Sequence, residues 1–91
     1  MKYETEHGSY EMPELTYKGL SRYVTHHVSP GSFLRAVLSN DLLSSFLIAD
    51  DYNAIAMYDI VKFCYLELPH SCWGSQGVVD KWIANEEAKN D

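Results

Sequence analysis

The fold of this chain is decided by residues 50–68, which read DDYNAIAMYDIVKFCYLEL. Large apolar side chains recur there every three or four residues, a spacing that predicts an amphipathic helix. Asp50 or Asp51 can cap its start, and Pro69 ends it because proline disfavours the helical conformation in the preceding residue. The predicted buried stripe consists of Ile55, Tyr58, Val61, Tyr65 and Leu68.

Upstream of this segment the pattern predicts a helix over residues 16–28, although Gly19 lies inside it. A glycine within a helix costs about 1 kcal/mol relative to alanine, so its presence suggests close packing at that point. A second helix is expected just beyond, because Ser29 can act as a cap and Pro30 suits the first helical position.

Residues 33–38 and 42–47 carry further apolar stripes, separated by the turn-forming residues 39–41. They form either two helices or one bent helix. After the loop that follows Pro69, Ser75 can cap a last helix. Its expected buried face consists of Val78, Val79, Trp82 and Ile83.

These segments together predict one all-α domain, a compact bundle of four to five short helices covering residues 14–85. Residues 1–13 are polar and acidic and read as an irregular N-terminal arm, with a short edge strand near Tyr10. The arm is either frayed or clamped by a partner. Residues 86–91 read as a polar tail.

The composition excludes several classes of function. The net charge is −6 and no basic stripe is present, which excludes binding to duplex nucleic acid. No run of about 18 apolar residues is present to cross a membrane, and the N-terminus lacks a signal-like apolar stretch. We therefore expect a cytoplasmic protein, in which Cys64 and Cys72 are free thiols rather than a disulfide. Since a 91-residue chain buries only ~60–65% of its unfolded surface, we also expect a homo-oligomer.

No catalytic apparatus, metal site or cofactor motif is predicted. The segment Ser71-Cys72-Trp73 is similar to part of a papain-like motif, but the preceding Cys-Gly pair is missing and the chain is too short for that fold. His26 and His27 are adjacent, so on a helix they point about 100° apart and cannot share one metal ion.

One arrangement favours the binding of an anion. Helix N-termini present free N–H groups and partial positive charge, and two scarce arginines lie near the first of two Ser- and Gly-containing helix starts. Aromatic side chains could stack on a planar base. The simpler interpretation is that the serines are caps, Trp73 is core and the arginines are surface residues. The candidate ligand-binding residues are Arg22, Tyr23, Ser32, Arg35, Tyr65, Trp73 and Ser75.

Two stretches, residues 29–42 with Pro-Gly-Ser-Phe-Leu and residues 68–75 with Cys-Trp-Gly-Ser, resemble a family of short uncharacterised proteins of bacteriophages and prophages. Arg22-Tyr23 and Trp82 extend the resemblance over roughly residues 18–84. The resemblance implies a small protein acting in the host cytoplasm, and no activity is assigned to that family.

Small acidic phage proteins often act stoichiometrically on the host, an argument by analogy. The first hypothesis is therefore a non-enzymatic antagonist of host defence that sequesters a small, cyclic nucleotide signal. The alternative is a stoichiometric inhibitor that binds a host protein through an acidic or tyrosine-rich surface. A structural or regulatory phage component is a weaker third interpretation.

Overall fold

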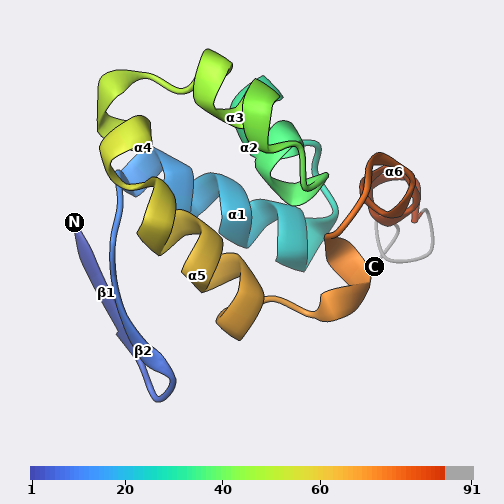
Figure 1. Ribbon diagram of the computed structural model, residues 1–91. Coiled ribbons are helices and arrows are strands. Elements are labelled where there is room, and N and C mark those ends of the chain that lie inside the picture. The colour runs from blue at the N-terminus through green and yellow to red at the C-terminus, as the bar shows by residue number, and fades with distance from the viewer. Residues whose placement is uncertain (86–91) are drawn as a thin grey trace.

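The computed structural model describes residues 1–85, which form a short β-hairpin and six α-helices (Figure 1). The predicted tail at 86–91 lies outside the described residues. The strands are β1 Lys2–Thr5 and β2 Gly8–Glu11. The helices are α1 Glu14–His26, α2 Ser32–Leu38, α3 Leu42–Ile48, α4 Asp51–Ile55, α5 Met57–Glu67 and α6 Gln76–Ile83, with a 3-10 turn at His70–Cys72. No helix of the described part is long and apolar enough to cross a membrane.

The chain is mostly helical, as predicted, but the expectation of a purely all-α fold is wrong. The N-terminal arm is an antiparallel hairpin in which Tyr3 pairs with Tyr10 and Thr5 with Gly8. Its two-residue turn, Glu6-His7, lacks the Asn-Gly or Asp-Gly signature of tight hairpins. The Thr5 hydroxyl instead accepts a hydrogen bond from the His7 N–H at 3.0 Å, so a side chain replaces the missing turn signal.

The helices from the middle of the chain are shorter than predicted. Residues 33–47 form two helices, because Asn40 adopts a left-handed conformation (φ 63°) and Asp41 caps α3 by accepting the Ser44 N–H at 3.2 Å. The segment expected to be one long helix divides at Ala56 into α4 and α5. Neither proline nor glycine marks this division, so no local signal predicts it.

The hydrophobic core lies where the hairpin, α1, α2, α5 and α6 meet. Gly19 of α1 allows the close approach that its position suggested, since a Cβ there would lie 3.0 Å from Leu34 Cδ1 of α2. The core residues are Tyr10, Met12, Leu20, Tyr23, Leu34, Leu38, Ile60, Phe63, Cys64, Leu68, Cys72 and Val79.

The predicted buried face of the long helix is wrong except at Leu68. Ile55 is 85% exposed and Tyr58, Val61 and Tyr65 are also exposed. The buried face of α5 is instead the neighbouring stripe of Met57, Ile60, Phe63 and Cys64. Both stripes repeat every three to four residues, so the helix is apolar nearly all round and its pattern cannot select the buried side.

Helix α3 shows the same reversal. Its apolar residues were expected in the core, yet only Ser45 is buried, and Leu47 is 86% exposed. The molecule measures 35 × 30 × 19 Å, and its shortest dimension is roughly the width of two helices. Such a thin domain cannot enclose every apolar helix face, so some faces remain on the surface.

Candidate functional site

The structure does not assemble the anion site predicted from the sequence. Arg35 is held by Asp80 of α6, with Nη2 2.7 Å from Oδ1, and its Nη1 donates to Ser29 Oγ at 3.3 Å. The guanidinium therefore joins α2 to α6 and its charge is neutralised within the fold. Arg22 is exposed on α1 and forms no ion pair with the residues of the described part.

Tyr23 belongs to the core and cannot stack on a ligand. Its side chain is fully buried, and its hydroxyl donates to the Cys72 carbonyl at 2.6 Å. Its own carbonyl accepts the Trp82 indole N–H at 2.7 Å. Burial, followed by the nearby Cys72 thiol, raises the pKa of Tyr23. The residue therefore joins α1 to the segment that leads into α6.

The two serines lie at helix starts, but only Ser75 acts as a cap. Ser75 Oγ accepts the Val78 N–H at 3.2 Å, so the predicted cap of α6 is confirmed and that acceptor is used. Ser32 is exposed as the first residue of α2, which is preceded by Gly31 as the capping residue. Ser29 therefore does not cap this helix, because the loop after α1 extends as far as Gly31.

Tyr65 and Trp73 are the predicted site residues that the structure brings together. Their ring centroids lie 5.8 Å apart, and the His70 ring lies 5.2 Å from Trp73. The indole N–H of Trp73 is buried without a hydrogen-bond partner among residues 1–85. No described lysine or arginine stacks on these two rings, so the cluster is aromatic but lacks the cation that a phosphate would need.

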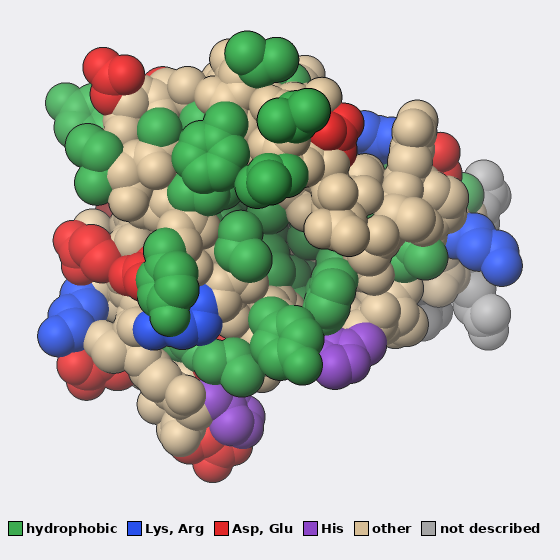
Figure 2. Space-filling model, viewed as in Figure 1, with side chains coloured by type: hydrophobic (Ala, Val, Ile, Leu, Met, Phe, Trp, Pro, Cys, Tyr) green, Lys and Arg blue, Asp and Glu red, His purple; other side chains and the backbone are tan. Residues whose placement is uncertain are grey.

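The dominant feature of the surface is an exposed apolar face built by α3, α4 and α5. Figure 2 shows apolar side chains gathered over the side of the molecule that these helices form. We call it the apolar face and define it by Leu42, Leu43, Phe46, Leu47, Ile48, Tyr52, Ile55, Tyr58, Val61 and Tyr65. Monomeric proteins rarely expose apolar patches beyond a few hundred Å², and larger ones mark interaction sites.

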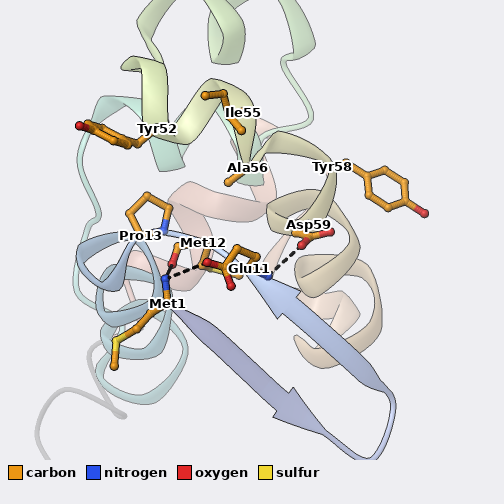
Figure 3. A pocket seen from close by; sticks show the side chains of 9 residues that line it. All are labelled: Met1, Glu11, Met12, Pro13, Tyr52, Ile55, Ala56, Tyr58 and Asp59. Carbon is orange, nitrogen blue, oxygen red and sulfur yellow. Dashed lines mark hydrogen bonds and ion pairs between the residues drawn. The ribbon is translucent and has the colours of Figure 1, made fainter.

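A hollow of about 490 Å³ lies at one end of the apolar face. Figure 3 shows how it forms between the end of the hairpin, with Glu11 and Pro13, and the junction of α4 with α5, with Tyr52 and Ile55. The Glu11 N–H donates to Asp59 Oδ2 at 2.8 Å, which fixes the hairpin against α5. Most of the lining is apolar, with carboxylates at its border.

A second hollow, of about 310 Å³, lies between α3 and α5. Ser45 of α3 and Met57 and Cys64 of α5 line it, together with Tyr65 and Trp73. In Figure 2 it corresponds to the recessed apolar surface near the centre of the view. The first hollow adjoins the start of α5, and the second runs along α5 from Met57 to Tyr65.

The hairpin that borders the first hollow is anchored by Glu67 at the end of α5. Its Oε2 accepts hydrogen bonds from the Thr5 and Tyr10 hydroxyls, both at 2.5 Å, and its Oε1 lies 3.4 Å from His7 Nδ1. Burial raises the pKa of Glu67, but the hydrogen bonds from Thr5, Tyr10 and His7 together outweigh it, so the pKa is lowered. The carboxylate form therefore holds the hairpin in place.

The two cysteines are buried and lie in the core. Burial, and to a smaller extent the charge of its neighbour Cys72, raises the pKa of Cys64 to about 12. Burial also raises the pKa of Cys72, to about 11. Both thiols are free and remain protonated at neutral pH, which makes them poor nucleophiles. Within residues 1–85, no three metal-ligating side chains lie close enough to hold an ion.

Comparisons with known proteins found no match among protein-family models, curated proteins or solved structures. The resemblance to phage proteins therefore stays a prediction. Sequence reasoning missed the apolar face because it assigned those same residues to the core. The sequence did carry one signal of this face. Helix α5 has two complete apolar stripes, which is more apolar surface than one buried side of a helix needs.

Proposed function

We propose that this chain is a non-enzymatic binding protein that holds a protein partner against its apolar face. The exposure of large apolar side chains along three consecutive helices carries the proposal. Three of them, Tyr52, Tyr58 and Tyr65, are tyrosines, a residue enriched at protein interfaces because it combines apolar area with a polar tip. The resemblance to phage proteins makes a host protein the partner that we expect.

The exposed residues are poorly explained by the stability of the isolated chain. A leucine such as Leu47 contributes to folding only when water is removed from it, and at 86% exposure it contributes almost nothing. It also raises the risk of aggregation. Its contribution would be realised when a partner covers it, which is the pattern of an interface core.

Sequestration of a nucleotide has less support. It needs a free cation beside a stacking platform, but Arg35 is paired with Asp80 and Tyr23 lies in the core. Native mass spectrometry with a panel of cyclic mono-, di- and trinucleotides tests this candidate. If the protein gains one nucleotide mass per site and Arg22→Glu loses this gain, nucleotide sequestration would replace our proposal.

The proposed function is tested by quantitative affinity capture from a bacterial host lysate. We would compare the wild-type chain with the face variant Leu47→Ser/Tyr58→Ser and with Arg22→Glu as a control off the face. We expect one host protein at stoichiometric yield with the wild type and the control, reduced at least about tenfold with the face variant. Equal capture by all three proteins, or no stoichiometric partner, would contradict the proposal.

A further inference from the structure

The border of the apolar face carries a charge that selects the kind of partner. Asp41, Asp50, Asp51 and Asp59 lie at the starts of α3, α4 and α5, next to the exposed leucines and tyrosines. None of the four forms an ion pair within residues 1–85. Asp41 and Asp50 each use one oxygen to accept a cap hydrogen bond, and the helix N-terminus balances only part of a full negative charge.

These carboxylates distinguish between the possible occupants of the face. A second copy of this chain would bring another border of the same sign and a further net charge of −6, which opposes association. An anionic lipid surface is opposed for the same reason. A partner with lysine or arginine around its apolar residues meets complementary charge at these helix starts.

The shape of the face favours a helix. The second hollow lies between α3 and α5, the arrangement in which a groove receives the apolar face of an amphipathic helix. Tyr58 borders the first hollow and Tyr65 the second. They are seven residues apart on α5, a rise of about 10 Å, which matches apolar anchors seven residues apart on a bound helix.

We infer that the partner contributes a basic amphipathic helix, whose apolar side lies along the groove between α3 and α5 and whose cations face Asp41, Asp50, Asp51 and Asp59. This inference rests on the proposed function and specifies the chemistry of the partner. A basic side chain, Lys62, also lies on the border, with its ammonium 5.6 Å from the centroid of the Tyr58 ring. We expect the cations of the partner to lie away from Lys62, because like charges repel.

The probe for the test is a synthetic helix of about 18 residues with leucines at three- and four-residue spacing and lysines elsewhere. Two comparison peptides carry glutamate in place of lysine, or the same composition with the spacing scrambled. Binding is measured by fluorescence anisotropy of the labelled peptide. We expect the lysine peptide to bind at least about tenfold more tightly than either comparison, with an affinity that falls as salt increases.

A matched pair of variants assigns the charge effect to the border. Asp41→Asn/Asp51→Asn keeps the cap of α3, because asparagine caps as well as aspartate, and should weaken the lysine peptide about fivefold. Glu4→Gln/Glu6→Gln on the hairpin makes the same change in net charge and should leave its affinity within about twofold. Equal losses in the two variants would overturn the inference, since the attraction would then come from net charge alone.

The remaining outcomes separate the inference from the proposed function. If lysate capture depends on Leu47 and Tyr58 but the lysine and glutamate peptides bind equally, the inference fails and the proposed function stands. If the chain self-associates at micromolar concentration and Leu47→Lys abolishes this in light scattering, a second copy occupies the face and the inference fails. If capture is unaffected by the face variant, the proposed function itself fails, whatever the peptides do.

Discussion

Replacing Tyr23 with phenylalanine tests whether this residue belongs to the core or to a ligand site. The Tyr23 hydroxyl donates to the Cys72 carbonyl at 2.6 Å, and both residues are fully buried. Removing the hydroxyl leaves a buried acceptor without a partner and little space for water. Such a loss costs about 1–3 kcal/mol of the free energy of unfolding.

The assay is urea denaturation followed by circular dichroism. A chain of this size has a denaturant dependence of about 1 kcal/mol per molar urea, so the midpoint should fall by about 1 M or more with an unchanged slope. Tyr52→Phe is the matched control, because Tyr52 is 76% exposed. Its free energy of unfolding should stay within about 0.5 kcal/mol of the wild type. Equal midpoints for the two variants would refute the placement of Tyr23 in the core.

Three further predictions concern other parts of the fold. The pKa of Glu67 is lowered from 4.5 in the folded state, so its contribution to stability is present above that pH and lost as pH falls through the folded value. When the free energy of unfolding is measured against pH, the variant Glu67→Gln should not show this acid-dependent loss of stability. Because Cys64 and Cys72 are buried, a thiol reagent at pH 8 should label them only at the rate of unfolding, and fast labelling would contradict their burial. Asn40→Val, at φ 63°, should cost about 1–3 kcal/mol in urea melts, whereas Asn40→Gly should cost nothing.

The helix starts were the most predictable part of the fold. Asp50 and Ser75 each cap the helix that their position indicated, Asp41 in the expected turn caps α3, and α5 ends before Pro69. These signals are local, because a cap depends on a side chain and a backbone N–H only two or three residues away. Tertiary packing does not need to be known to recognise them.

The buried side of each helix was much less predictable. In α5 the stripe of Met57 and Ile60 and the stripe of Tyr58 and Val61 have the same spacing, and only contacts with α1 and the hairpin select the first. The strand near Tyr10 was expected, but its pairing into a hairpin was not, because the anchor Glu67 lies 57 residues along the chain from Tyr10. The candidate site depends on both choices, so it could not be located from the sequence.

Photo-crosslinking in bacterial cells tests the central claim most directly. A benzophenone amino acid is placed at Leu47, which is 86% exposed on the apolar face, and in a second strain at Glu4 on the hairpin. The account predicts one crosslinked adduct of this chain with a single other protein from position 47, and none with that protein from position 4. Adducts of this chain only with itself, or the same adducts from both positions, would contradict the account.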